Sequence, residues 1–286
     1  MLDTMQGGKY HFQIAVIYRN SYLISSILAS SEVWYGVTQV EYEQLEAVDE
    51  MFMKNLFHCS SGVPAELLYL ELGLWPIRHI VMKRRCLYLH HILQQKEDSL
   101  ISSFFLSQMM NPRQGDWVSQ VLNDLNSLKI KDELEQIGTM KKEKFCSLLN
   151  VKIQDLAFNW LLQKKEARIS ENAKGKDLKY TQFEMAEYLG SDNDMSIEEK
   201  KWLLKCRVED INVKANRRWQ FDNIMCSSCN TNSEETQFHI LECKTLIGPS
   251  EILTYIPNYR DLFEGDTESQ AYVSRLLKDN HGRIAV

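Results

Sequence analysis

The stretch Cys226-Ser227-Ser228-Cys229, followed by His239 and Cys243, carries the densest chemistry in this sequence. Its pattern is Cys-x2-Cys, nine residues, His, three residues, Cys, so four potential metal ligands fall within eighteen residues. Thiolate and imidazole ligands in such a set suit one tetrahedral Zn²⁺ with no coordination position left open. The spacing therefore predicts a structural, not catalytic, zinc site formed by Cys226, Cys229, His239 and Cys243.

The two halves of this stretch are expected to fold differently. The cysteine pair and the loop 230–238 are polar and typical of a turn, whereas Phe238 begins an apolar segment. His239 and Cys243 are four residues apart, which places both on one face of a helix. A closed zinc site supplies about 10–16 kcal/mol of binding free energy to folding. We expect a small zinc-stabilised module; the alternative is four unconnected, reduced residues.

The composition is that of an ordinary globular chain. Of 286 residues, 44% are hydrophobic and 25% charged, and only five are proline. Few helix breakers interrupt the periodic segments, which favours a helical fold. The net charge of −6 excludes a uniformly basic nucleic-acid binder, so any such role needs a local patch.

The cysteines and the apolar segments indicate where the chain resides. Seven cysteines is an odd number without a disulfide spacing pattern, which indicates a reducing compartment. The first residues lack a signal-peptide pattern, and no apolar run is long enough to span a membrane. We expect a soluble intracellular protein, cytoplasmic and/or nuclear, with no membrane partner.

Helix start signals recur along the chain. Thr38 with Glu41 forms a capping-box pattern before a helix over about 39–57, and Ser196 with Glu199 forms a second before a helix over about 197–209. Asp116 is a natural N-cap. The stretch from Phe12 to Leu28 fits either a short strand followed by a helix or a buried helix. Further helices are expected over 65–72, from 77 onward, 131–136, 141–149 and 154–168.

These signals predict a mainly α fold, with a multi-helix bundle-like region followed by the small zinc module. Turn residues near 111 and the polar run 190–196 divide the chain. We predict a helical region over 1–110, a second over 111–190, and a C-terminal region over 191–286. The last region contains a basic helix, the zinc module and a C-terminal helix.

Two groups of basic residues could contact phosphates. On the helix after Pro76, Arg78, Lys83, Arg84 and Arg85 form either a solvated face or a phosphate-facing stripe. His90 and His91 on the same helix are expected to be partly buried and hydrogen-bonded, not catalytic.

The second group lies between 200 and 219, where lysines and arginines are interleaved with Trp202 and Trp219. Basic side chains beside aromatic ones can pair with phosphates and stack on unpaired bases. Alternatively, Trp202, Leu203 and Cys206 belong to the core and the charges only solvate the helix. The residues predicted to contact RNA or DNA are Lys201, Lys205, Arg207, Lys214, Arg217, Arg218 and Trp219.

Several ordered blocks resemble one family. The stretch EETQFHILEC after the Cys-x2-Cys pair is similar to the zinc-binding element that follows the polymerase domain in non-LTR (LINE-like) retrotransposon reverse transcriptases. The blocks SSEVWYGVT, EQLEAVDEMFMKNLF, PAELLYLELGLWPIR, RRCLYLHHIL and GDWVSQVLNDL resemble, in order, the helical region after the palm and thumb of these enzymes. The resemblance covers about residues 10 to 275.

The resemblance implies a C-terminal fragment that binds nucleic acid and does not catalyse. Such polymerases need a Tyr/Phe-x-Asp-Asp turn for two Mg²⁺ ions, and this sequence has none, nor an endonuclease signature. We therefore expect no enzyme activity and identify no small-molecule substrate. The expected binding to RNA or DNA is weak and salt-sensitive. Two alternatives remain: a zinc-stabilised protein-interaction scaffold, and a retroelement remnant without function.

Overall fold

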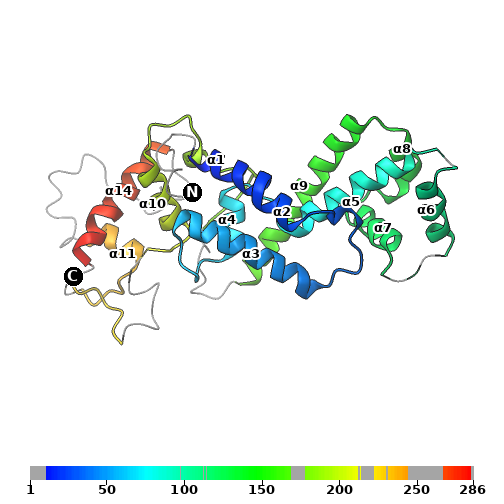
Figure 1. Cartoon of the computed structure of the whole chain (residues 1–286). Coiled ribbons are helices and arrows are strands. Elements are labelled where there is room, and N and C mark those ends of the chain that lie inside the picture. Colours follow the sequence, from blue (N-terminus) through cyan, green and yellow to red (C-terminus); the bar gives the residue numbers. More distant parts are fainter. Residues whose placement is uncertain are drawn as a thin grey trace. The chain divides into compact units, whose positions relative to one another are not determined.

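The computed structural model describes residues 11–96, 98–111, 113, 115–168, 178–211, 213, 222–229, 231–243 and 267–284 (Figure 1). Across these ranges the chain is mainly helical, and its only extended pairing consists of two isolated antiparallel bridges. The predicted mainly α fold is confirmed. None of the described helices is both long and apolar enough to cross a membrane.

The chain forms two compact units whose segments alternate along the sequence. The first comprises 1–16, 52–73 and 164–286, and the second comprises 17–51 and 74–163. Each unit therefore combines segments that are distant in sequence. The predicted division into 1–110, 111–190 and 191–286 stays a prediction.

The second unit is built around helix α5 (Ile77–Leu93). Buried side chains of α5, α6, α7 and α9 share one core with Ile137 of α8, including Leu89, Val121, Phe145 and Leu149. The other elements of this unit are a π-helical turn (Arg19–Leu23), α2 (Ile24–Ile27), a 3-10 turn (Ser31–Val33), most of α3 (Gln39–Phe57), α6 (Leu100–Met110), α7 (Trp117–Ser127), a 3-10 turn (Lys131–Glu133), α8 (Leu134–Thr139) and most of α9 (Lys142–Ala167).

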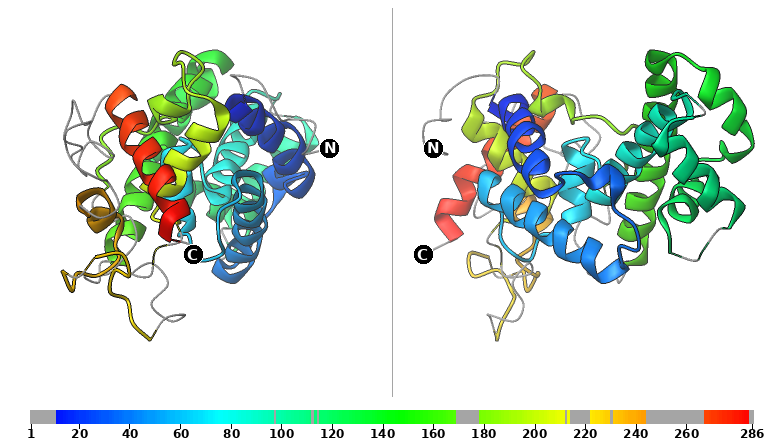
Figure 2. Two further views of the ribbon diagram at one scale, coloured as in Figure 1. Left: turned by 90° about the vertical axis from the view of Figure 1, so that its left-hand side faces the viewer. Right: turned by 45° about the vertical axis from the view of Figure 1, so that its right-hand side comes forward.

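The first unit carries the metal-ligand pattern. Its α10 (Ile197–Arg207) packs against α14 (Thr267–Ile284), and Figure 2 shows these two helices, yellow-green and red, side by side. The helix α14 also contacts α11 (Gln237–Glu242). Its other elements are most of α1 (His11–Tyr18), α4 (Ala65–Glu71), a 3-10 turn (Glu187–Leu189) and the ends of α3 and α9. Arg275 of α14 forms an ion pair with Glu199 of α10.

The predicted helix caps are present. The Thr38 amide donates to Glu41 at 2.7 Å, and the Glu41 amide donates to the Thr38 hydroxyl at 3.3 Å. Ser196 and Glu199 form the same reciprocal box at the start of α10. Asp116 accepts from the Ser119 amide at 2.7 Å and begins α7. These predictions are confirmed. Each cap involves only residues within one helical turn, so its signal is present in the local sequence.

Two helix predictions need correction. The expected helices over 141–149 and 154–168 are one 26-residue helix, α9. No glycine or proline separates them, and Leu149, Ile153, Ala157 and Leu161 continue the buried face at intervals of four residues. Residues 12–16 lie within the helix α1 (His11–Tyr18), so the strand alternative for Phe12–Val16 is wrong.

A buried polar cluster centres on Glu71 in the first unit. Its carboxylate accepts from Arg207 Nε at 3.0 Å, from the Tyr180 hydroxyl at 2.9 Å and from the Tyr188 hydroxyl at 2.8 Å. The Glu71 side chain is 0% exposed and that of Arg207 is 7% exposed. The cluster joins α4 to α10, and α10 is the helix that the metal-ligand region contacts.

Gly73, just after α4, is required by its surroundings. Its φ is +60°, and a Cβ atom there would lie 2.6 Å from backbone atoms of Glu184 and Met185. The Ala186 amide donates to the Glu71 carbonyl at 2.8 Å, which holds the two chain segments at this distance.

The basic residues of α5 form neither a solvated face nor a phosphate stripe. Arg85 is buried and pairs with Asp124 at 2.7 Å, while Arg78 pairs with Glu46 at 2.7 Å. Arg84 donates to the Leu28 carbonyl, and Lys83 lies over the Trp75 ring. All four side chains contact other groups of the second unit. They therefore form neither the solvated face nor the phosphate-facing stripe, and both predictions are wrong.

Candidate metal centre

The cysteine pair lies at a backbone turn closed by an antiparallel bridge between Met225 and Glu234. The Cys226 amide donates to the Ser233 carbonyl at 2.9 Å, and the Glu235 amide donates to the Ile224 carbonyl at 2.8 Å. These two hydrogen bonds pair the backbone on either side of the turn that carries Cys226 and Cys229.

The other two ligands are positioned by α11. Thr236 is its N-cap, because the Thr236 hydroxyl accepts from the His239 amide at 2.9 Å. Ile240 and Leu241 are buried on one side of α11. The opposite side of this helix carries the half-buried His239 and faces the cysteine pair. Cys243 caps the helix at its C-terminus. The prediction that both residues lie on one face of a helix holds only for His239, because Cys243 follows α11 in extended backbone.

The four ligand atoms converge. The Sγ atoms of Cys226, Cys229 and Cys243 and a ring nitrogen of His239 all lie within 4.8 Å of one another. Cys229 Sγ is 3.3 Å from His239 Nε2. Zn–S bonds of about 2.3 Å and Zn–N bonds of about 2.0 Å give tetrahedral edges of roughly 3.5–3.8 Å. This arrangement could hold one metal ion, and the donor set fits a closed tetrahedral site.

The thiols are available as ligands. All seven cysteines of the chain are free rather than paired in disulfides. The Thr231 hydroxyl and then the Thr231 amide stabilise the Cys229 thiolate, with smaller contributions from Cys226 and His239, and lower the Cys229 pKa to about 6. The thiolate is the form of cysteine that binds metals. By contrast, burial raises the pKa of the Cys86 and Cys206 thiols far above its usual range, and these two residues belong to the core.

The metal-ligand region is attached to α10. Gln237 Nε2 donates to the Cys206 carbonyl at 3.1 Å, and both groups are buried. Cys226 is 8% exposed and Cys243 2% exposed, whereas Cys229 and His239 are half-buried. The cluster therefore has one face covered by the first unit and one face near solvent.

Only part of the predicted nucleic-acid surface lies on described residues. Lys201 and Lys205 are half-buried on α10, and desolvation, followed by repulsion from Lys205, lowers the pKa of Lys201. Arg207 is buried and paired with Glu71, so it is removed from the predicted contacts. Lys214, Arg217, Arg218 and Trp219 lie outside the described residues.

His90 is buried, as expected, whereas His91 is exposed, so the expectation of partial burial is wrong for His91. The Nε2 atom of His90 lies 2.9 Å from the Met140 carbonyl oxygen, and the His90 ring stacks on Phe145 at 4.9 Å. These contacts make His90 a packing residue of the second unit.

Sequence reasoning missed the threonines that support the ligands and a pocket in the second unit. Thr231 and Thr236 are two and seven residues after Cys229, and a hydroxyl directly before an apolar turn is a capping signal. The pocket is lined partly by α6, a helix that was not predicted. Its aromatic pair Phe104–Phe105 in a short apolar run was the available signal.

Comparisons of the chain with protein-family models, with curated proteins and with solved structures each give no match. The geometry of the site therefore carries the functional argument.

Proposed function

We propose that this chain is a zinc-stabilised, non-catalytic nucleic-acid-binding module of the kind that follows the polymerase domain of non-LTR retrotransposon reverse transcriptases. The convergence of four Cys and His ligand atoms within 4.8 Å is the observation that carries the proposal. It supports the sequence resemblance at the residues where that resemblance is most specific.

Zinc is the metal that this donor set favours. Three thiolates and one imidazole in a tetrahedral arrangement are typical of structural Zn²⁺ sites, and they leave no position for a reacting water. When bound, the ion supplies folding energy. The chain's own residues fix the ligands: the Thr236 cap orients His239, and the 224–235 turn orients the cysteines.

Lys201 and Lys205 provide the positive charge of the proposed contact. They are four residues apart on α10, which places both side chains on one face of the helix, where their charges repel each other. A phosphate between them would relieve this repulsion. Because the whole chain has a net charge of −6, the contact is expected to be weak and to decline steeply with salt.

Zinc-loaded protein titrated into labelled single-stranded RNA at low and at moderate salt tests this proposal. We expect Lys201→Ala/Lys205→Ala to weaken binding and to reduce the slope of log affinity against log salt by about one to two. The matched control is Lys141→Ala/Lys144→Ala, which removes two exposed charges from the second unit. Absence of binding at low salt, or equal effects of both pairs, would refute the proposed contact.

A protein-interaction scaffold is the second candidate. The apolar side chains exposed along α6 favour it: Leu100 is 88% exposed, Phe104 64% and Met110 78%. Exposed apolar patches of this kind mark interaction surfaces. A scaffold would capture partners in a manner insensitive to salt and to nuclease, which separates it from the first candidate.

A further inference from the structure

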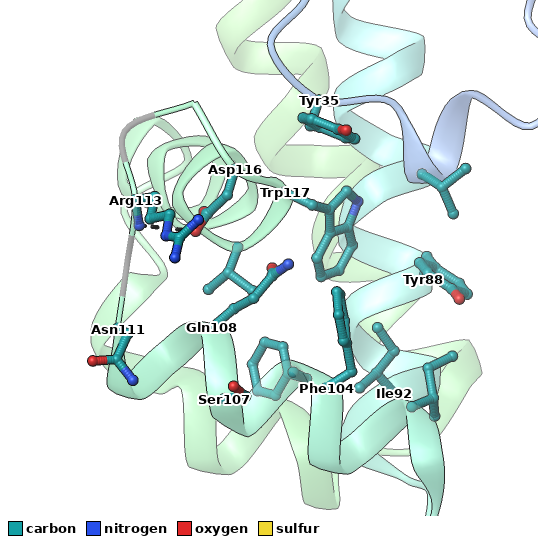
Figure 3. A pocket seen from close by; sticks show the side chains of 14 residues that line it. Tyr35, Tyr88, Ile92, Phe104, Ser107, Gln108, Asn111, Arg113, Asp116 and Trp117 are labelled. Carbon is teal, nitrogen blue, oxygen red and sulfur yellow. Dashed lines mark hydrogen bonds between the residues drawn. The ribbon is translucent and has the colours of Figure 1, made fainter.

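The second unit contains a pocket of about 910 Å³ that no part of the proposed function uses. It lies among α5, α6, α7 and the segment around Tyr35. Its lining is rich in aromatic rings: Figure 3 shows Tyr35, Trp117 and Phe104 along one side, with Tyr88 nearby on α5. A volume in this range is typical of cavities that bind small ligands.

Trp117 forms a fixed platform in this pocket. Its indole Nε1 donates to the Glu32 carbonyl at 2.8 Å, and its ring meets Tyr88 edge-on at 5.6 Å. Trp117 is also the first residue of α7, directly after the Asp116 cap. The ring orientation is therefore set before any ligand binds, which lowers the entropic cost of stacking against it.

Two further rings are held less firmly. Phe104 is 64% exposed and Tyr35 is 66% exposed, so both present aromatic surface to water beside Trp117. Aromatic rings prefer offset-stacked partners. A planar ring entering the pocket would meet aromatic surface in its lining.

Polar groups lie on the other side of the pocket. The amide of Gln108 and the hydroxyl of Ser107 come from α6, Asn111 directly follows that helix, and Arg113 precedes α7. Figure 3 shows Asn111 and Arg113 away from the Tyr35, Trp117 and Phe104 rings. Amide groups provide adjacent donors and acceptors, and a guanidinium can pair with a phosphate.

We infer that this pocket binds an unpaired nucleobase, stacked against Trp117 and Phe104 with its edge toward Gln108 and Asn111. Proteins recognise unpaired bases through this combination of aromatic stacking and edge hydrogen bonds. The lining pairs aromatic surface with hydrogen-bonding groups, the half-buried Gln108 amide among them, and a purely apolar peptide segment would use the rings alone. The base can come from a free nucleotide or from a single strand; the strand source rests on the proposed function.

The test compares two strands of equal length and charge, one with bases and one with abasic sites at its central positions, by fluorescence anisotropy with the full chain. Phe104→Ala is expected to weaken binding of the base-containing strand about 5- to 150-fold, the range for loss of one stacked base, and to leave the abasic strand unchanged. Leu106→Ala, on the same helix and 46% exposed but not in the pocket lining, should change neither.

Phe104→Tyr keeps the flat ring and is expected to retain binding, which guards against a folding defect in the alanine variant. The inference is overturned when Phe104→Ala affects both strands equally, when Phe104→Leu binds as well as Phe104→Tyr, or when an apolar peptide competes and a base does not.

Titration with adenosine monophosphate, followed by NMR of the tryptophan indole signals, separates the two sources of the base. A shifted Trp117 signal that Phe104→Ala abolishes supports the pocket even if no strand binds, in which case only the proposed function fails. Strand binding that depends on Lys201 and Lys205 but not on Phe104, together with an unchanged Trp117 signal, refutes the pocket alone.

Discussion

Glu71→Ala is expected to destabilise the first unit by about 3–5 kcal/mol, because it leaves the Arg207 guanidinium buried without its counter-charge. Glu71 is 0% exposed and Arg207 7% exposed, so water cannot replace the lost carboxylate. The Tyr180 and Tyr188 hydroxyls, which donate to Glu71 at 2.9 and 2.8 Å, would lose the same acceptor. Hydrogen bonds to a charged group contribute about 1.5–3 kcal/mol each, so the loss of these two adds to the effect.

Urea unfolding followed by circular dichroism measures this effect. Arg207→Met should be destabilising as well, because it leaves the Glu71 carboxylate buried. The double variant Glu71→Ala/Arg207→Met is expected to lose clearly less stability than the sum of the two single variants, because neither charge is then buried alone, although the Tyr180 and Tyr188 hydroxyls still lack their acceptor. A loss below about 1 kcal/mol for Glu71→Ala, or strictly additive losses in the double variant, would refute a tightly coupled pair.

Two further predictions concern single positions. Gly73→Ala should cost more than about 2 kcal/mol, because it combines the left-handed φ of +60° with a Cβ atom 2.6 Å from the Glu184 backbone, and thermal unfolding measures it. Burial and then the neighbouring Arg78 charge lower the pKa of His79 to about 3, so the folded protein keeps this side chain neutral. The unfolded chain takes up that proton below its ordinary pKa of about 6.5. Stability is therefore complete above pH 6.5 and falls by up to about 1.4 kcal/mol per pH unit below it, which His79→Gln should abolish in a pH series of urea melts.

Matched controls accompany both predictions. Gly115 has a φ of +85° but open space around its Cβ position, so Gly115→Ala should show only the backbone strain. An equal cost at both glycines would mean that the clash at Gly73 is relieved. His58 is exposed, and His58→Gln should leave the pH dependence unchanged. If the loss of stability at acid pH persists in His79→Gln, groups other than His79 cause it.

The helix starts were predictable because their signals are local. Thr38 with Glu41, Asp116, and Ser196 with Glu199 each complete a cap within three residues. The partners of the buried cations were not predictable in this way. Arg85 meets Asp124 39 residues later, and Arg207 meets Glu71 136 residues earlier. A sequence pattern cannot distinguish such cations from solvated ones, because the distinction depends on tertiary pairing.

The candidate metal site was predictable for a different reason. Its ligands lie within eighteen residues, so a turn and one short helix suffice to bring them together. The supporting contacts were only partly accessible: Thr236 follows a capping rule, whereas the Gln237–Cys206 hydrogen bond joins elements 31 residues apart. The aromatic pocket was missed because Tyr35, Tyr88, Phe104 and Trp117 come from four separate segments.

Metal content of the purified chain tests the central claim most directly. Mass spectrometry under native conditions should find one Zn²⁺ in the unmodified protein and in Cys146→Ser, which replaces a half-buried thiol outside the cluster. Cys226→Ser and His239→Ala should lose the ion or bind it far more weakly, because each removes one of the four converging ligands. Equal zinc content in all four proteins would contradict the assignment of Cys226, Cys229, His239 and Cys243 as the metal centre.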